Sequence, residues 1–426
     1  MKKFLAVMAL AAVAAWAQAE ELDEEVAAAP AGGADEAVAE TVQDEPADGE
    51  LAAAASAGVR AGFAVAGVPG GEGVTAESVR IAAAEAVVRA LDPRAEFRRA
   101  DEGALEEGWT WDAGLWVLPC RDGVRVSSVR EGGAAAAAGV EAGWTVCGVE
   151  GKSAGEVQLW LEGGDEARLE VVFATADGEK KTVVLERETA AGRSVAESGL
   201  LPTGIGYVRL RAVEAGAKEE TAEVLKAWGE TAPGGVVLDL RGAGGESLAG
   251  AAAVAGLFAA AGAELWNMEE SDGLSAVFRC GEEGRAYEGV LMLLTDEGTR
   301  RAGELLAAAL AGQKGVMAIG GESAGDPMVR EWVALTDGVE ARTAVRRVVA
   351  GGGAVYAGQG GVVPDVEVGA SAHLEEPYEP REPRLRKGKT LSEEEIEDRA
   401  LRDRTRYDAV LRRATDIVLG LRAMSK

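Results

Sequence analysis

The sequence is short of the side chains on which several common kinds of catalysis depend. It has one histidine, His373, in 426 residues, so mechanisms that need a histidine pair or a Ser-His-Asp set are excluded. Its three cysteines are Cys120, Cys147 and Cys280, and none stands in a Cys-x-x-Cys pair. A zinc knuckle or a disulfide framework is therefore not expected, and we expect no metal and no other cofactor.

Basic residues are scarce relative to acidic ones. The chain has 44 Lys and Arg against 72 Asp and Glu, a net charge of −28. A nucleic-acid-binding protein neutralises phosphates with clustered basic side chains, so that class of function is excluded. Docking on an anionic lipid surface is disfavoured for the same reason. With 58 glycines and only 5% aromatic residues, we expect cores of small side chains and many turns.

The first 74 residues predict export followed by an unfolded leader. Residues 1–19 combine two lysines, an apolar stretch and a terminal Ala-Gln-Ala, the pattern of a cleavable signal peptide. A retained signal anchor is the alternative. Residues 20–74 begin with a segment, 20–50, that holds twelve acidic residues and no basic one. This composition favours a disordered spacer, with an acidic binding motif as the other interpretation. We expect an exported, periplasmic protein with no membrane span after signal cleavage.

The apolar pattern changes twice along the next 300 residues. Residues 75–112 open with a helix over 75–91, where apolar residues recur with a period near 3.6. Residues 113–190 contain short β-rich runs bounded by Gly or Asp turns, with one small-residue helix among them. Residues 191–370 alternate apolar strands with helical stretches, which is typical of a layered α/β core.

The end of the chain predicts a linker and a helix. Residues 371–391 are rich in Pro and Arg, and residues 392–426 favour one long helix. Apolar residues in this helix recur at i, i+3, i+4 and i+7 and form one stripe. The stripe contains Tyr407, Val410, Leu411, Ala414, Ile417, Val418 and Leu421. It predicts packing against the chain's own body or, alternatively, a homodimer contact through this helix.

The segment 113–190 resembles a PDZ domain. Residues 132–144 (GGAAAAAGVEAGW) correspond to the family's GSPAxxAGLxxGD segment, with Trp144 in place of its Asp, and residues 146–154 (VCGVEGKSA) correspond to IxxVNGxxV. The resemblance implies that a peptide C-terminus binds at a loop with exposed backbone N–H groups. The residues of this loop are Gly114, Leu115, Trp116 and Val117. An unrelated small β-barrel is the alternative.

Four further fragments resemble the C-terminal processing, or tail-specific, serine peptidases over about residues 77–421. Residues 90–93 (ALDP), 204–208 (GIGYV), 237–245 (VLDLRGAGG) and 362–366 (VVPDV) follow the order and spacing of that family's LDPxSxY, IGYI, LILDLRGNPGG and GIxPDI. The resemblance implies a multidomain α/β fold. In it a PDZ-like β-rich domain precedes a split α/β peptidase core and a C-terminal helix.

The same resemblance implies that the catalytic chemistry has been lost. The family uses a serine nucleophile, a lysine base and a glutamine that orients the lysine. The matching positions here are Arg301, Asp326 and Arg330, which we expect to form an ion-pair cluster. A guanidinium stays protonated and cannot attack a carbonyl group. The backbone positions of the oxyanion hole remain, as Gly244, Gly245 and Ala302.

These residues predict a catalytically inactive homologue that binds peptide or protein C-termini. One alternative is an active serine endopeptidase with a displaced nucleophile, for which Ser323, Thr299 and Ser247 are the nearest hydroxyls and Lys314 the nearest lysine. An exposed loop serine is more often plain polar surface. Another alternative is a regulatory or assembly subunit that docks on an active paralogous peptidase.

Overall fold

The structure is a computed structural model that describes most of the chain after residue 75. It covers residues 76–99, 111–163, 166–190, 192–228, 234–269, 275–281, 285–325, 328–335, 338–350, 360–369, 372 and 392–425. The predicted signal peptide, the acidic leader, His373 and nearly all of the linker 371–391 lie outside these residues. Two compact units divide the chain, and each is described by itself.

The first unit comprises the chain up to Leu105 with the segments Met268–Ala276 and Met328–Val348. Its helix α4 (Ala76–Leu91) corresponds to the helix expected over 75–91. Its strands β1 (Glu96–Arg99) and β16 (Met328–Ala334) each pair antiparallel with β17 (Val339–Ala350). Strands β12 (Glu264–Glu269) and β13 (Ser275–Arg279) lie only in part within this unit.

The second unit contains two larger sheets, of which the first is antiparallel. Its five strands pair in chain order: β3 (Leu115–Cys120), β4 (Gly123–Val129), β5 (Thr145–Val146), β6 (Arg168–Ala174) and β7 (Lys180–Glu186). Two helices, α5 (Ala134–Ala137) and α6 (Ala154–Glu162), pack with this sheet around one apolar core. A short pair, β2 (Trp111–Asp112) with β8 (Glu188–Thr189), flanks it. Strand β3 lies at the edge of this sheet, so no strand pairs with its outer side.

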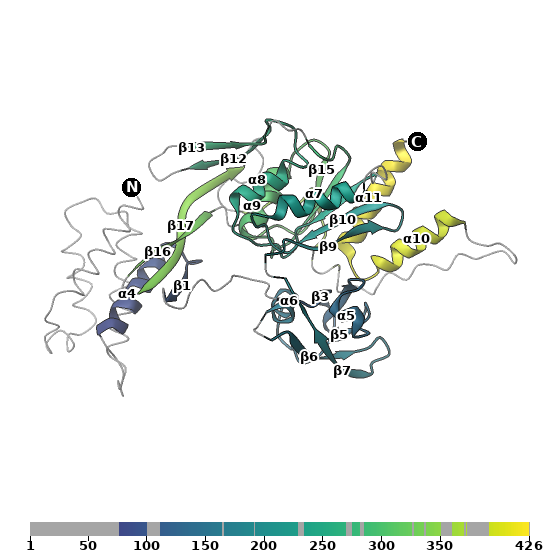
Figure 1. Cartoon of the computed structure of the whole chain (residues 1–426), viewed down its shortest axis with the longest axis horizontal. Helices are drawn as coiled ribbons and strands as arrows, with labels where there is room; N and C mark the ends of the chain where they lie inside the picture. The colour runs from purple at the N-terminus through teal and green to yellow at the C-terminus, as the bar shows by residue number, and fades with distance from the viewer. Residues whose placement is uncertain are drawn as a thin grey trace. The chain divides into compact units, whose positions relative to one another are not determined.

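The second sheet of this unit is mostly parallel and has the order β18-β15-β14-β11-β10-β9. Its strands are β9 (Val195–Leu201), β10 (Ile205–Leu210), β11 (Val236–Asp239), β14 (Leu291–Thr295), β15 (Val316–Gly320) and β18 (Val366–Glu367). The helices α7 (Ala217–Trp228), α8 (Leu248–Ala255) and α9 (Arg301–Leu310) connect them. Continuous apolar strands such as β14 are buried on both faces, as parallel sheets require. The mixed α/β fold expected from the sequence is therefore confirmed (Figure 1).

The predicted C-terminal helix is in fact two helices, α10 (Glu393–Arg404) and α11 (Ala409–Ser425). Asp408 breaks the helix because its carboxylate accepts a hydrogen bond from Leu411 N and an ion pair from Arg241. The apolar stripe of α11 packs on β10, β11, β14 and β15 of its own unit, through Val410, Leu411, Ala414 and Val418. Figure 1 shows α7, α8 and α9 on the side of the sheet away from α11. The stripe thus has a partner within the chain.

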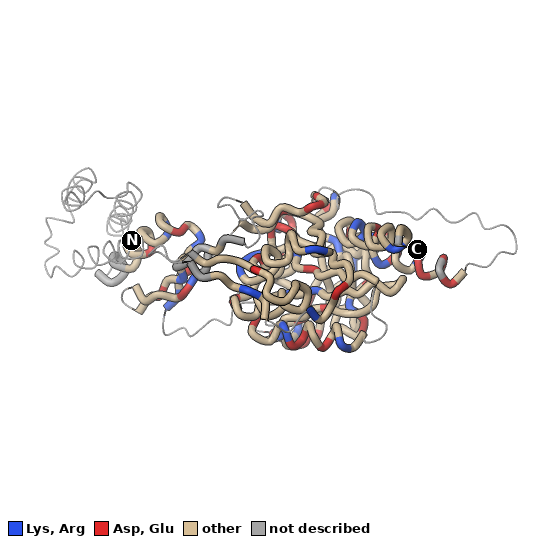
Figure 2. The backbone as a smooth tube through the Cα atoms, turned by 90° about the horizontal axis from the view of Figure 1, so that it is seen from above, with Lys and Arg blue, Asp and Glu red and all other residues tan. Residues whose placement is uncertain are grey.

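Charge is distributed evenly over the described elements. Figure 2 shows acidic and basic residues interspersed along the backbone. No helix among the described residues is long and apolar enough to span a bilayer. The described residues likewise contain no group of three His, Cys, Asp or Glu side chains that could hold a metal ion. All three cysteines have free thiols.

Candidate functional site

The turn between β14 and α9 contains the position at which the sequence resemblance places the nucleophile. Arg301 is the first residue of α9 and has a φ of +54°, a left-handed conformation that non-glycine residues seldom adopt. A sharp strand-to-helix turn with strained backbone is the arrangement that presents the nucleophile in several hydrolases. The side chain presented here is a guanidinium, which pairs with Glu246 at 2.9 Å.

Buried hydrogen bonds fix this turn against the glycine turn that follows β11. The Asp296 carboxylate accepts from Gly242 N at 2.9 Å and from Gly298 N at 3.0 Å. The Thr299 hydroxyl donates to the Leu240 carbonyl at 2.8 Å. Burial raises the pKa of Asp296, although these backbone donors and Arg241 oppose the rise. The two turns therefore behave as one rigid feature.

The backbone N–H groups expected to form an oxyanion hole are largely engaged within the chain. Ala302 N donates to the Gly245 carbonyl at 3.1 Å, and Gly244 N donates to the Arg211 carbonyl at 3.2 Å. Gly245 has a φ of +100°, and a Cβ there would lie 2.4 Å from Val213 N, so only glycine fits. An oxyanion hole needs donors aimed at the developing charge, and two of the three candidates are aimed elsewhere.

The three alternative hydroxyl nucleophiles all have structural partners. Ser323 donates to the buried Glu304 carboxylate and accepts from Val362 N at 2.7 Å. Thr299 is fully buried in the turn described above. Ser247 caps α8 by accepting from Gly250 N at 2.9 Å. Lys314, the nearest lysine in sequence, is exposed, whereas a lysine base needs burial to lower its pKa towards neutrality.

The other two positions aligned with the catalytic set do not add chemistry to this turn. Asp326 lies outside the described residues. Arg330 belongs to the first unit, where it pairs with Asp92 at 3.1 Å. Burial alone would raise the pKa of Asp92, but hydrogen bonds from Arg330 and Ala344 N hold that pKa below its usual value. Arg301 and Arg330 thus have carboxylate partners, Glu246 and Asp92, outside the cluster that we expected.

The loop expected to receive a peptide C-terminus is buried and internally hydrogen-bonded. Gly114 has a φ of +69°, and its N–H donates to the Asp112 carboxylate at 2.8 Å. The side chains of Leu115 and Val117 point into the core of the five-stranded sheet. Trp116 points to the opposite face, as strand alternation requires, and only 7% of it is exposed.

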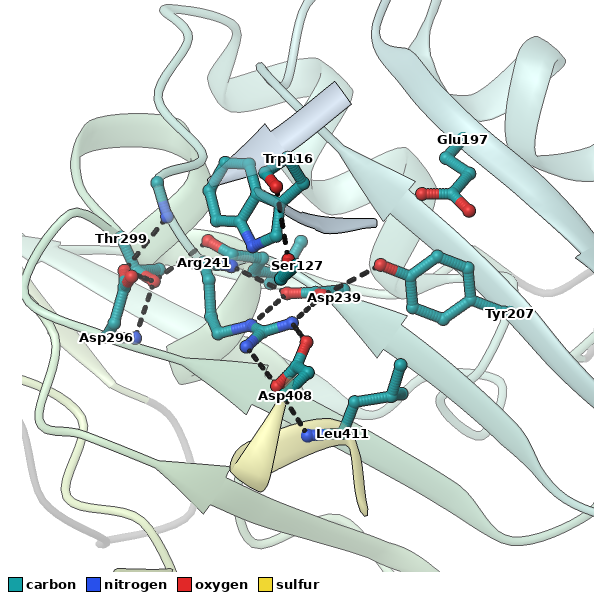
Figure 3. A network of polar contacts seen from close by, with 12 residues as sticks. Trp116, Ser127, Glu197, Tyr207, Asp239, Arg241, Asp296, Thr299, Asp408 and Leu411 are labelled. Carbon is teal, nitrogen blue, oxygen red and sulfur yellow. Dashed lines mark hydrogen bonds and ion pairs between the residues drawn. The ribbon is translucent and has the colours of Figure 1, made fainter. Parts of the chain in front are cut away.

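Trp116 packs on the six-stranded sheet instead of facing a ligand. The guanidinium carbon of Arg209 lies 4.1 Å from the centre of its ring, and that of Arg241 lies 6.0 Å away. A Cβ at Gly242 would come within 3.3 Å of the indole. Figure 3 shows Trp116 over the Arg241 network. Trp116 therefore anchors β3 to the glycine turn that follows β11.

A side chain of α6 occupies the outer edge of β3. Val117 N donates to Gln158 Oε1 at 3.0 Å, and Gln158 Nε2 donates to the Leu115 carbonyl at 3.1 Å. These are the two hydrogen bonds that an added peptide strand would make to this edge. Gln158 is 1% exposed. The amide thus closes the edge of β3 in the way that a bound peptide would.

Behind Gln158 lies a buried group of charged side chains. Gln158 Nε2 also donates to Glu162 Oε1 at 2.6 Å, and Glu162 lies 3.6 Å from Arg211. Arg211 and Arg130 both pair with Asp112 at 2.6 Å. Burial raises the pKa of Glu162 to about 7 in spite of the attraction to Arg211. The pKa of Glu162 therefore lies near neutral pH.

Sequence inspection missed α6 and with it Gln158 and Glu162. A signal was present, because Ser153 and Glu156 form a capping box at the start of this helix. The Ser153 hydroxyl accepts from Glu156 N at 3.2 Å, and Glu156 accepts from Ser153 N at 2.6 Å. The helix is nine residues long, so its apolar period is sampled only twice and is easily overlooked.

A second buried network joins the α/β sheet to the C-terminal helices. Arg241 donates to both oxygens of Asp408, at 2.9 and 2.8 Å, and also pairs with Asp239. Tyr207 donates to Asp239 at 3.0 Å (Figure 3). Burial would lower the pKa of Arg241, but the two carboxylates raise it well above its usual value. Since all four side chains are buried, this network is structural.

Comparison with known proteins identifies a peptidase family that this chain resembles. Residues 204–368 match the model of peptidase family S41. The C-terminal processing peptidase, chloroplastic, of Tetradesmus obliquus is 27% identical over 258 residues, which is 56% of this chain and 55% of that protein. The chain thus spans about half the length of this curated relative.

Two solved structures illustrate the similarity. An S41 protease from Bacteroides fragilis shares 18% identity, with 76% of this chain and 87% of that one covered at a TM-score of 0.51. A photosystem II D1 C-terminal processing protease shares 23% identity, with 68% and 83% covered at a TM-score of 0.43. Over its α/β core, this chain is similar to the C-terminal processing peptidases of family S41.

Proposed function

We propose that this protein is an exported, non-proteolytic homologue of the C-terminal processing peptidases that binds peptide or protein C-termini through a PDZ-like domain. The observation that carries the loss of proteolysis is the turn at the start of α9. Its strained first residue is Arg301, whose guanidinium pairs with Glu246. Acyl transfer by such a site needs a hydroxyl or thiol at this point, with a base in reach.

The remaining hydroxyls support the same conclusion. Ser323, Thr299 and Ser247 each hold a buried contact or a helix cap. None of them has a lysine or histidine among its described hydrogen-bond partners, so no base of those types activates them in the described part of the chain. Periplasmic localisation rests on the predicted signal peptide alone.

Three features support a peptide ligand. The five-stranded sheet with α5 and α6 has the element order of a PDZ domain. Its edge strand β3 offers backbone groups, at Leu115 and Val117, that a peptide strand would use. The curated relative is named for processing C-termini, and a binding groove can outlast the loss of the reactive residues.

Casein digestion tests the loss of proteolysis. We expect the purified protein to release no peptide above a buffer control, as measured by mass spectrometry over many hours. Ser323→Ala and Thr299→Ala variants run beside it. Cleavage by the wild type that one of these substitutions abolishes would contradict the proposal and identify a displaced nucleophile.

Removal of Gln158 tests the peptide edge. The Gln158→Ala variant frees Val117 N and the Leu115 carbonyl, so a peptide no longer has to displace two hydrogen bonds. We expect about tenfold tighter binding of C-terminal peptides, because two neutral hydrogen bonds are worth about 1–3 kcal/mol. Fluorescence anisotropy with a pool of labelled decapeptides measures it. Leu159→Ala, on the exposed face of the same helix, is the control, and equal affinities for both variants would argue against β3 as the site.

A further inference from the structure

Arg209 on β10 is a buried guanidinium that forms no ion pair or charge-assisted hydrogen bond in the described part of the chain. The residue is 5% exposed, and its Nε has no hydrogen-bond partner. The guanidinium carbon lies 4.1 Å from the centre of the Trp116 ring, and Glu162 attracts the guanidinium without forming an ion pair with it. A buried charge without a hydrogen-bonded partner is costly, so a group from outside the chain would be favoured beside it.

Neighbouring arginines show the contrast. Each of them pairs with a carboxylate of the chain: Arg211 with Asp112, Arg241 with Asp408, and Arg404 with Glu197. Arg209 lies on strand β10, as Tyr207 does. Glu197, the cross-strand neighbour of Arg209 on β9, pairs with Arg404 instead, so Arg209 differs from these arginines in having no ion pair.

The guanidinium lines a small polar pocket beside the loop at Gly114 and Leu115. The pocket is shallow, and most of the roughly 200 Å³ of empty space around it belongs to the open solvent at its mouth. Its two acidic side chains, Asp112 and Glu197, are already neutralised by the arginines named above and, for Asp112, by Arg130 as well. Among the residues that line the pocket, Arg209 is thus the charged side chain for which no ion pair is described.

We propose that this pocket receives the terminal carboxylate of a peptide bound along β3, with Arg209 as the receptor. This inference rests on the proposed function and assigns the carboxylate to a side chain of the α/β core. The loop N–H groups cannot take that role unchanged, since Gly114 N already donates to Asp112 and Val117 N to Gln158. Trp116 covers one face of the guanidinium and leaves its edge for a planar, bidentate carboxylate.

Peptides with and without a free carboxylate test the assignment. The probe is a pool of fluorescein-labelled decapeptides with apolar last four residues, compared with the same pool amidated at its C-terminus. We expect the purified protein to bind the carboxylate pool at least tenfold more tightly. Arg209→Met should remove this difference, Arg209→Lys should keep part of it, and Arg168→Met, at an exposed position of β6, should leave it unchanged. A difference that survives in Arg209→Met overturns the proposal.

Acetate separates failure of this proposal from failure of the proposed function. If neither peptide pool binds the wild type, the peptide-binding function is wrong, and the pocket is then tested alone. The NMR signal of the Arg209 side-chain Nε–H, assigned by its loss in Arg209→Lys, is followed during an acetate titration. A saturable shift supports a carboxylate site that is filled by small free carboxylates. A shift that is absent, or that rises linearly without saturation, overturns the site.

Discussion

Replacing Asp408 by alanine is expected to lower the free energy of unfolding by about 3–5 kcal/mol. Asp408 is 2% exposed and accepts two hydrogen bonds from the guanidinium of Arg241. Its removal leaves the buried guanidinium of Arg241 with one ion-pair partner, Asp239, instead of two. It also removes the acceptor for Leu411 N at the start of α11, which is worth about a further 1 kcal/mol.

Urea unfolding of the purified protein measures this loss of stability. Two further variants show which interaction is responsible for it. Asp408→Asn keeps an acceptor for Leu411 N but removes the negative charge, so it isolates the contribution of the ion pair. Asp416→Ala replaces an exposed aspartate of the same helix and is the control. If Asp408→Ala destabilises the protein no more than Asp416→Ala does, the network does not hold α11 on the sheet.

Most of the second unit could be predicted from the sequence because its elements are long and strongly patterned. Strands β10, β11 and β14 are mostly apolar runs, and α7 has a clear polar face. The apolar stripe of α11 was also identified. The stripe gave no sign of the helix break that precedes α11. That break involves a contact between Asp408 and Arg241, which is 167 residues away in the sequence.

The surroundings of Trp116 could not be predicted from the sequence. The alternation of side chains along a strand shows only that Trp116 points to the face opposite Leu115 and Val117, and not what lies on that face. Its sequence context assigned it to a peptide-binding loop. The structure packs it on Arg209 and Gly242, which belong to another sheet. A partner of this kind has no local signature. The hairpin of β16 and β17 was missed for a related reason, because it joins a sheet with β1, over 200 residues earlier.

Part of the candidate site could be predicted from the sequence. The replacement of the nucleophile by Arg301 can be predicted from the spacing of residues around it, but its partner Glu246 cannot, because the two meet only when the turns after β11 and β14 come together. The engaged amides of Ala302 and Gly244 were equally hidden. Sequence shows which residue types are present, whereas hydrogen-bond availability depends on the folded backbone.

The second large effect is expected in the pH dependence of stability, through Glu162. Burial raises the pKa of this carboxyl from 4.5 to about 7, while in the unfolded chain it returns to its ordinary value. Between these two values the folded protein binds more protons than the unfolded chain does, so the free energy of unfolding falls as pH rises. The contribution of Glu162 is fully present below about pH 4.5 and is lost as pH rises through 7. A shift of this size corresponds to a loss of about 3 kcal/mol.

Glu162→Gln should remove this dependence, because a glutamine keeps the acceptor for Gln158 Nε2 and has no proton to lose. The measurement is urea unfolding of both proteins from pH 5 to pH 8. Subtraction of the two curves cancels every other titrating group, and the stability of the wild type relative to the variant should fall by about 2.5 kcal/mol across the range. Glu170→Gln, at an exposed position of β6, should show no such trend.

A difference between wild type and Glu162→Gln that does not change with pH would contradict this prediction. It would mean that Glu162 is already ionised at pH 5, with its negative charge stabilised by Arg211 and Arg209. In that case the edge of β3 would be closed by an ion-paired side chain, and Gln158 would be held equally firmly at every pH in this range.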